Sequence, residues 1–236
     1  MIDIVYKWRN RLGVLGECLL PLRCLICEEP GAEGRDLCRA CHAALPWNVP
    51  ACRICALPLA SSNPVCGPCL RRSNRPLDET HAVFSYRFPL DRLLPRFKFH
   101  RDLAAGRLLS MLMAGDCAGL PRPDAIVPIP LHWRRLSSRG YDQALELARP
   151  LARMLRIPLR GDLLRRVRST RPQSELDAAE RRRNLRAAFT VRAPPPAHVV
   201  LLDDVMTTGA TLEAAARGLR AAGARRIDAW VCARTL

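Results

Sequence analysis

The residues of this chain that are best suited to chemistry gather in one stretch, VVLLDDVMTTGATL, at positions 199–212. Four apolar residues run into two acids, Asp203 and Asp204, and a short loop follows them. Carboxylates accept hydrogen bonds from hydroxyl groups and hold hydrated Mg²⁺, whereas threonine hydroxyls can donate to an anion. The stretch therefore predicts one site for hydroxyls and phosphate, whose loop residues are Thr207, Thr208, Gly209, Ala210 and Thr211.

The surroundings of the two acids predict where this site lies in a fold. VVLL indicates a buried strand ending at Asp203, and residues 212–223 indicate a helix closed by Gly223. Ligands of parallel α/β sheets sit beyond the carboxyl ends of the strands, and a helix start offers N–H groups and a positive dipole to phosphate. A sugar that carries a 5-phosphate, free 2- and 3-hydroxyls and a diphosphate would meet these demands. The alternative is a capped strand-to-helix turn without a ligand.

The cysteines form a second motif. Eight of the 11 lie in four C-x-x-C knuckles, and the pattern C-x2-C-x10-C-x2-C occurs twice, 28 positions apart. Two knuckles supply the four thiolates of a closed tetrahedral zinc site. The repeat therefore predicts two structural Zn²⁺ ions, with ligands Cys24, Cys27, Cys38 and Cys41 in one site and Cys52, Cys55, Cys66 and Cys69 in the other.

The pairing of the knuckles is less specific than their number. Ten residues also separate the second knuckle from the third, so an interleaved arrangement competes with the sequential one that we favour. Redox chemistry and disulfides fit four evenly spaced knuckles poorly, and His42 is a less favoured substitute ligand. Prolines punctuate residues 22–75, which predicts mostly turns whose folding depends on metal binding.

From about residue 80, strand-like and helix-like segments alternate. This order predicts an α/β domain with a mainly parallel sheet. Within the helix expected over 137–155, Pro150 predicts a kink or a restart. The other expected helices are 90–100, 103–115, 174–189 and 212–223, the strands are 82–88, 124–131, 199–202 and 226–236, and the prolines at 194–196 form a rigid spacer.

The amino terminus and the net charge indicate where in the cell the protein is expected to act. Residues 1–21 are predicted to form an amphipathic helix that packs on the protein itself, and charged residues interrupt any secretory signal. No run approaches the roughly 18 apolar residues that cross a bilayer, so we expect a cytoplasmic chain without membrane insertion. The net charge of +16 fits attraction to nucleic acid or phosphate, but an arginine-rich composition typical of high-GC genomes explains it equally well.

Several motifs together resemble known families. VVLLDDVMTTGATL is similar to the 5-phosphoribosyl-1-diphosphate (PRPP) motif of type I phosphoribosyltransferases over its full length. Together with the cysteine units, PIPLHWRRLSSRGYDQA and STRPQSELDAAERRRNLRAAF, it resembles the ComF family of competence-associated, amidophosphoribosyltransferase-like proteins. The resemblance covers residues 20–236. The expected domains are the helix 1–21, a double zinc ribbon at 22–75 and a phosphoribosyltransferase-like domain at 80–236.

This resemblance implies roles for individual residues. Asp203 and Asp204 would face the ribose hydroxyls as catalytic-site residues, with Mg²⁺ accompanying PRPP, and the loop 207–211 would wrap the 5-phosphate. Arg139 and Gly140 would lie near the diphosphate, and the segment around Thr170 and Gln173 would be a mobile loop. The chain departs from the expected pattern where Tyr141 and Asp142 replace Phe and Asn, which puts the closeness of Asp142 to the ligand in doubt.

Two functions follow from the resemblance. The first is a PRPP-binding phosphoribosyltransferase linked to DNA uptake. The sequence carries no base-recognition signature and so does not identify the acceptor of the phosphoribosyl group. The second is a non-catalytic factor that binds single-stranded DNA and uses the PRPP site for regulation. Single-stranded DNA and a DNA-uptake helicase are the macromolecular partners expected. An aromatic content of 5% weakens a dedicated base-stacking surface.

Overall fold

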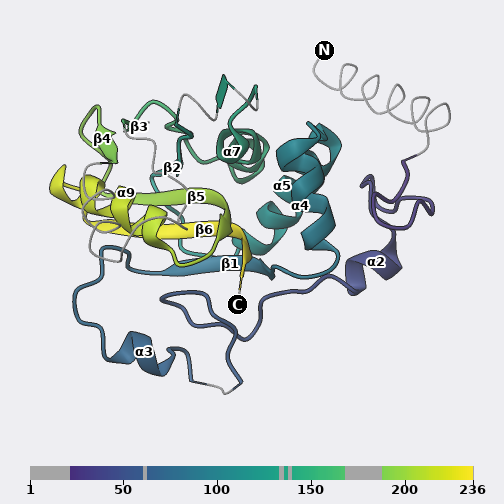
Figure 1. Ribbon diagram of the computed structural model, residues 1–236, viewed down its shortest axis with the longest axis horizontal. Coiled ribbons are helices and arrows are strands. Elements are labelled where there is room, and N and C mark those ends of the chain that lie inside the picture. The colour runs from purple at the N-terminus through teal and green to yellow at the C-terminus, as the bar shows by residue number, and fades with distance from the viewer. Residues whose placement is uncertain (1–21, 61–62, 133–135, 138–139, 168–187, 236) are drawn as a thin grey trace, which may run out of the picture. The chain divides into compact units, whose positions relative to one another are not determined.

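The computed structural model describes residues 22–60, 63–132, 136–137, 140–167 and 188–235 (Figure 1). The chain divides into two compact units, residues 1–45 and 46–236. The division falls between the cysteine tetrads, so that the second tetrad belongs to the same unit as the sheet. The helix expected over 1–21 and nearly all of the helix expected over 174–189 lie outside the described residues.

Turns dominate both cysteine-rich segments, as their prolines predicted. The described part of the small unit contains short β-bridges and one helix, α2 (Arg39–Ala43), which begins after Cys38. The corresponding helix of the larger unit, α3 (Gly67–Leu70), begins after Cys66. Helices of four and five residues bury little apolar surface, so metal binding has to stabilise these segments.

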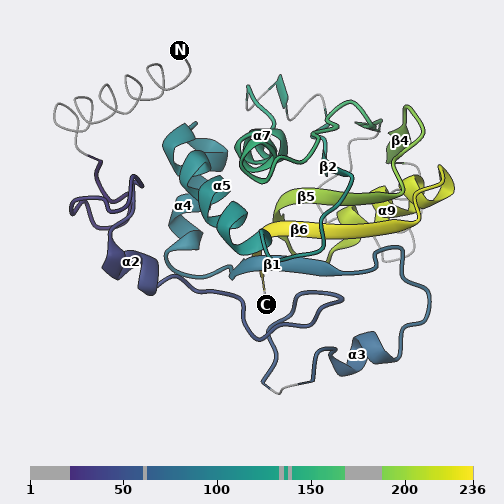
Figure 2. The same cartoon turned by 180° about the vertical axis from the view of Figure 1, so that it is seen from behind.

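The larger unit is built on a four-stranded sheet in the order β1-β6-β5-β2 (Figure 2). All three strand pairs are parallel, which confirms the predicted sheet type. The two central strands are almost entirely buried, as their apolar runs predicted. The strands are β1 (Thr80–Ser85), β2 (Ala125–Pro128), β5 (His198–Met206) and β6 (Arg226–Arg234), and β3 (Leu164–Arg166) pairs antiparallel with β4 (Phe189–Val191) in a separate small sheet.

Helices cover both faces of the four-stranded sheet. Helix α9 (Ala210–Ala221) packs on one face, and α5 (Leu103–Cys117) and α7 (Gln143–Leu155) lie over the other, with α4 (Leu90–Phe99) beside α5 (Figures 1 and 2). Alternate residues of a strand point to opposite faces, and Val199 and Leu201 share a buried core cluster with Leu212 and Leu219 of α9. None of the helices in the described parts of the chain has the length and apolar character needed to span a bilayer.

Several predicted boundaries were wrong, among them those of β5, β1 and α7. Strand β5 runs past the aspartates to Met206 because its pairing with β6 continues to Arg234. Strand β1 ends at Ser85, before the predicted end of its strand. Helix α7 begins only at Gln143, capped by Asp142, and continues through Pro150 without a restart, because a buried face packs against the sheet and against α5.

Candidate functional site

The first cysteine tetrad has the geometry of a zinc site. The four sulfur atoms of Cys24, Cys27, Cys38 and Cys41 lie within 4.8 Å of one another. The Sγ of Cys27 lies 3.6 Å from that of Cys38 and 3.5 Å from that of Cys41. Tetrahedral Zn–S bonds of about 2.3 Å require sulfur separations of about 3.8 Å, whereas a disulfide requires about 2 Å. The residues therefore fit one Zn²⁺ ion.

The second tetrad repeats this arrangement with Cys52, Cys55, Cys66 and Cys69. The Sγ atoms of Cys55 and Cys66 are 3.7 Å apart, and the N–H of Cys66 donates to the Sγ of Cys52 over 3.3 Å. Burial opposes the thiolate of Cys52, but backbone N–H groups outweigh it and lower the pKa of Cys52 to about 7. The sequential pairing is thus confirmed, and the chain carries two four-cysteine sites of the zinc-ribbon type; His42 belongs to neither.

The acid pair lies near the carboxyl end of β5. Because the side chains of neighbouring residues in a strand alternate, those of Asp203 and Asp204 point to opposite faces of the sheet. The Asp204 side chain is 13% exposed, and its Oδ2 lies 3.0 Å from the Nζ of Lys98, near the end of α4. Burial, followed by the charge of Asp204, raises the pKa of Asp203 well above its ordinary value.

Asp142 completes a group of three carboxyl groups. One oxygen accepts the N–H of Leu131 over 2.8 Å, and the other accepts the N–H of Leu145 over 3.1 Å at the start of α7. Burial raises the pKa of Asp142. The two N–H groups lower it, and the nearby charge of Asp204 raises it further. Asp142 therefore lies close to the acid pair, but its oxygens are used to fix the turn after β2 rather than left to face a diphosphate.

The loop after β5 has the backbone that the motif predicted. Thr207 and Thr208 are exposed, and Gly209 caps α9 with φ of +78°. The positive φ favours glycine, and a Cβ atom at this position would lie 2.5 Å from the Cε of Met206, so the flexible end of that side chain would have to shift. The first turn of α9, which contains Ala210 and Thr211, has N–H groups without acceptors inside the helix. This end of α9 suits an anion.

Only part of the predicted diphosphate segment can be located. Gly140 has φ of +82°, and a Cβ atom there would lie 3.0 Å from an Nη2 atom of the Arg101 guanidinium. Arg139, Thr170 and Gln173 lie outside the described residues. The structure thus places a cation, Arg101, against Gly140, at a position that the sequence did not single out.

No sequence motif marks three cations that lie beside the site: Lys98, Arg101, and Arg234, which donates to the carbonyl oxygens of Met206 and Thr207. Lys98 is one of only two lysines among 38 basic residues, which is a weak signal in the sequence. It lies in an amphipathic helix that suggested only packing. Arg101 and Arg234 stand in arginine-rich surroundings without any distinguishing pattern, so only tertiary contacts identify them.

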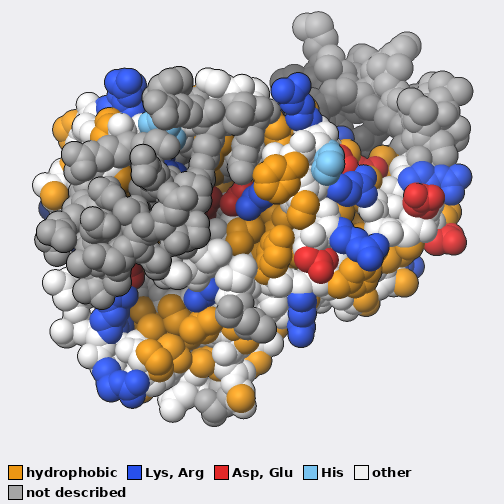
Figure 3. All heavy atoms as spheres, in the orientation of Figure 1, with side chains coloured by type: hydrophobic (Ala, Val, Ile, Leu, Met, Phe, Trp, Pro, Cys, Tyr) orange, Lys and Arg blue, Asp and Glu red, His pale blue; other side chains and the backbone are white. Residues whose placement is uncertain are grey.

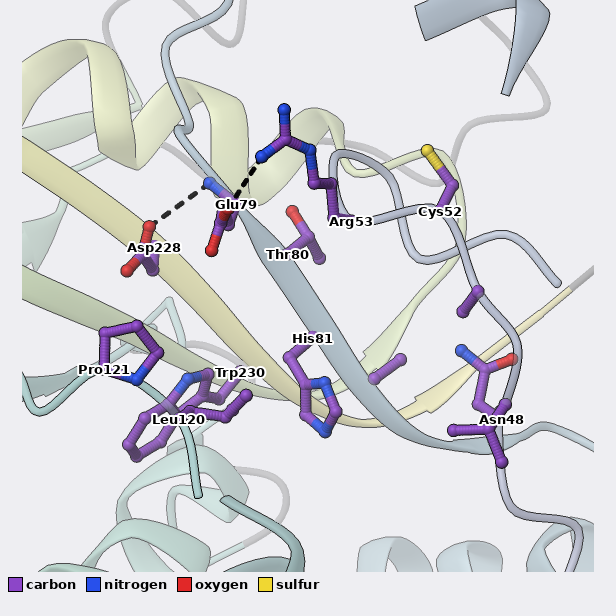
Figure 4. A pocket seen from close by; sticks show the side chains of 13 residues that line it. Asn48, Cys52, Arg53, Glu79, Thr80, His81, Leu120, Pro121, Asp228 and Trp230 are labelled. Carbon is purple, nitrogen blue, oxygen red and sulfur yellow. Dashed lines mark hydrogen bonds and ion pairs between the residues drawn. The ribbon is translucent and has the colours of Figure 1, made fainter. Parts of the chain in front are cut away.

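A hollow of about 190 Å³ opens elsewhere on the larger unit, beside the amino ends of β1 and β6 (Figure 4). Glu79, Thr80, Asp228 and Trp230 are among its lining residues. Because β5 and β6 run parallel, Asp203 lies toward the carboxyl ends of the strands, away from this hollow. Of the predicted site residues, Cys52 lines the hollow. The hollow therefore belongs to a different edge of the sheet from the acid pair.

Comparison with known proteins agrees with this geometry. Residues 15–70 match a model described as the double zinc ribbon domain, and residues 142–235 match the phosphoribosyl transferase domain. The chain is 37% identical over 225 residues to the DNA utilization protein YhgH of Salmonella typhi, covering 92% of this chain and 99% of that protein. It belongs to the ComF family. Further relatives are the competence protein F of Haemophilus influenzae, 35% identical over 84% of this chain and 90% of that one, and the competence protein ComFC of Bacillus subtilis, 28% identical over 71% and 70%.

Membership of the ComF family accounts for the two kinds of site in one chain. The zinc ribbon match contains both cysteine tetrads, and the phosphoribosyl transferase match begins at Asp142 and contains the acid pair and its loop. Lys98 and Arg101 lie between the two matched segments. In this chain, residues outside both matched segments therefore lie at the edge of the acid pair.

Proposed function

We propose that this ComF-family protein binds PRPP together with Mg²⁺ beyond the carboxyl end of β5. The observation that carries the proposal is the continuity of Asp203, Asp204 and the glycine-capped start of α9 within one strand-loop-helix segment. Carboxylates accept from hydroxyls, and a helix start attracts phosphate, so a single phosphorylated sugar spans both.

Each part of the proposed ligand has its own residues. Asp203 and Asp204 accept hydrogen bonds from the ribose hydroxyls. The 5-phosphate lies against the start of α9, where Thr207, Thr208 and Thr211 add hydroxyl donors to the backbone N–H groups of Gly209 and Ala210. When bound, Mg²⁺ would neutralise charge on the diphosphate, and the acid pair near the carboxyl end of β5 offers carboxylate oxygens to a hydrated cation.

Cations from other segments face the diphosphate end. Lys98 already offsets the charge of Asp204, and the guanidinium of Arg101 lies against Gly140. We assign Arg139 and Gly140 to the diphosphate, with Arg101 beside them. These residues favour departure of diphosphate by positioning it and by offsetting its charge, which are the main contributions expected in this type of transfer.

DNA utilisation is the physiological setting that we propose. The names of the YhgH and competence protein relatives support it, as does the net charge of +16. The basic side chains of the described residues are scattered over the face seen in Figure 3 rather than gathered in one stripe. The match to a phosphoribosyl transferase domain favours the transferase-like function over a factor that only binds DNA. Single-stranded DNA and an uptake helicase are proposed partners, and reduced cysteine tetrads support a cytoplasmic location.

The PRPP site is tested by thermal denaturation with and without PRPP and Mg²⁺. A ligand at 100 times its Kd stabilises the folded state by about 2.7 kcal/mol, which corresponds to a rise of about 5–10 °C for a chain of this size. Asp203→Asn with Asp204→Asn should abolish the rise. The double change relieves repulsion between the acids but also leaves Lys98 without its anion, so the melting temperature without ligand is compared first and the PRPP-dependent rise is measured from that baseline.

Asp162→Asn is the matched control, because Asp162 is 66% exposed and pairs with Arg160. An unchanged rise in the double variant would refute the site. Turnover is measured separately as diphosphate release from PRPP in the presence of a panel of bases and cell-extract metabolites. Release that requires one acceptor would establish a transferase.

A further inference from the structure

Arg234 occupies an unusual position at the end of β6. It is 7% exposed, and four hydrogen bonds hold its guanidinium. Its Nε donates to the carbonyl oxygen of Cys55 over 3.0 Å. The two hydrogens of its Nη1 are shared among three carbonyl oxygens, those of Met206 at 3.2 Å, of Thr207, and of Thr235 at 2.5 Å. Every acceptor in this set is a backbone carbonyl, so the side chain fixes backbone positions.

The two backbone segments that Arg234 joins belong to different sites. Cys55 is a ligand of the second cysteine tetrad. Met206 ends β5, and Thr207 opens the loop that leads to Gly209 and α9. One buried guanidinium therefore ties a zinc-ligating residue to the first residue of the proposed phosphate loop. Lysine would not replace it, because an ammonium group lacks the rigid fork of five donors.

A second link holds the other side of the same loop. Arg72, three residues after the zinc ligand Cys69, contacts Glu213 with both terminal nitrogens, over 2.5 and 2.9 Å. Glu213 lies in the first turn of α9. The segment that follows the second tetrad thus contacts the start of the helix, while Arg234 contacts the end of the strand. The loop between them is held from both sides.

We propose that Arg234 is a positioning residue through which the second zinc site and the phosphate loop stabilise each other. The proposal rests on the PRPP function above. Zinc at the second tetrad would fix the position of the Cys55 backbone. Because the Arg234 guanidinium is hydrogen-bonded to Cys55, its position is fixed as well, and it then restrains the carbonyl groups of Met206 and Thr207. Because coupling between binding sites is reciprocal, PRPP at the loop must stabilise zinc at the second tetrad by the same factor.

The first tetrad provides an internal comparison, because it lies in the other compact unit and none of these hydrogen bonds involves it. The experiment measures the rate of zinc loss from the full chain to a chromogenic chelator, with and without PRPP and Mg²⁺. Cys24→Ser with Cys27→Ser removes the first site, so the zinc that remains reports the second. Cys52→Ser with Cys55→Ser provides the converse chain.

We expect PRPP to slow zinc loss from the second site about fivefold or more, because the coupling stabilises the zinc-bound state from which dissociation starts, and to leave the first site unchanged. In Arg234→Lys, the rates of zinc loss from the second site with and without PRPP should be nearly equal. Arg72→Gln, at a half-exposed side chain, should reduce it and serves if Arg234→Lys fails to fold. Arg53→Gln is the matched control, because Arg53 belongs to the same ribbon but pairs with Glu79 near the start of β1.

The outcomes separate the two proposals. A PRPP-dependent rise in melting temperature without protection of the second zinc would overturn the coupling and leave the PRPP site intact. Equal protection of both zinc ions, or full protection in both Arg234→Lys and Arg72→Gln, would also overturn it. No rise in melting temperature with PRPP would overturn both proposals. A purely structural arginine would alter basal stability but not the effect of PRPP on zinc release.

Discussion

Adding one methyl group at Gly209 should weaken both the fold and the proposed phosphate site. The glycine has φ of +78°, and a left-handed conformation costs other residues about 1–2 kcal/mol. The new Cβ would lie 2.5 Å from the Cε of Met206, which must leave its rotamer at about 0.5–1.5 kcal/mol. Gly209→Ala should therefore lose about 1.5–3.5 kcal/mol, or about 3–14 °C in melting temperature.

The assay follows the melting temperature of Gly209→Ala with and without PRPP and Mg²⁺. Because the glycine caps α9, a shifted backbone misdirects the first N–H groups of the helix, and the PRPP-dependent rise should shrink. Adding Met206→Ala should remove the steric part of the cost and leave the conformational part, as a double-mutant cycle would show. Gly119→Ala, in open space, is the control. Wild-type stability together with a wild-type PRPP effect in Gly209→Ala would refute this reasoning.

Three other predictions concern packing, charge and metal. Gly106→Ala would place a Cβ atom 2.5 Å from the buried ring of Phe97 and should lower the free energy of unfolding by about 1–2 kcal/mol. In the same helix, the Cβ atom of Gly115→Ala would meet no atom within 4 Å, so this change should raise the free energy of unfolding by up to about 1 kcal/mol. Urea unfolding compares the two variants, and equal effects would contradict the packing argument. Lys98→Met leaves Asp204 without its cation and should cost about 2–3 kcal/mol, and Mg²⁺ should then stabilise the variant more than the wild type in calorimetry. Equal stabilisation by Mg²⁺ would argue against a cation site there. Elemental analysis of reduced protein should find two zinc ions per chain, and well under two would exclude the double site.

The sequence predicted best what is encoded locally. The zinc tetrads follow from C-x-x-C spacing, since each knuckle places two thiolates on one ion through its own backbone. The tight turn after β5 follows from Gly209, which adopts positive φ between a strand and a helix. Boundaries were less predictable: the continued pairing with β6 extended β5 to Met206, and a buried face carried α7 through Pro150.

The sequence by itself therefore determined the two cysteine sites, the parallel α/β class and the segment that holds Asp203, because each depends on neighbours within a few residues or on periodicity. Only the tertiary structure decided which cations surround that segment. Lys98 reaches Asp204 from a separate helix, and Arg234 joins Cys55 to Thr207 across 179 positions on one side and 27 on the other. Such contacts leave no local pattern, because they arise where the sheet brings distant strand ends together.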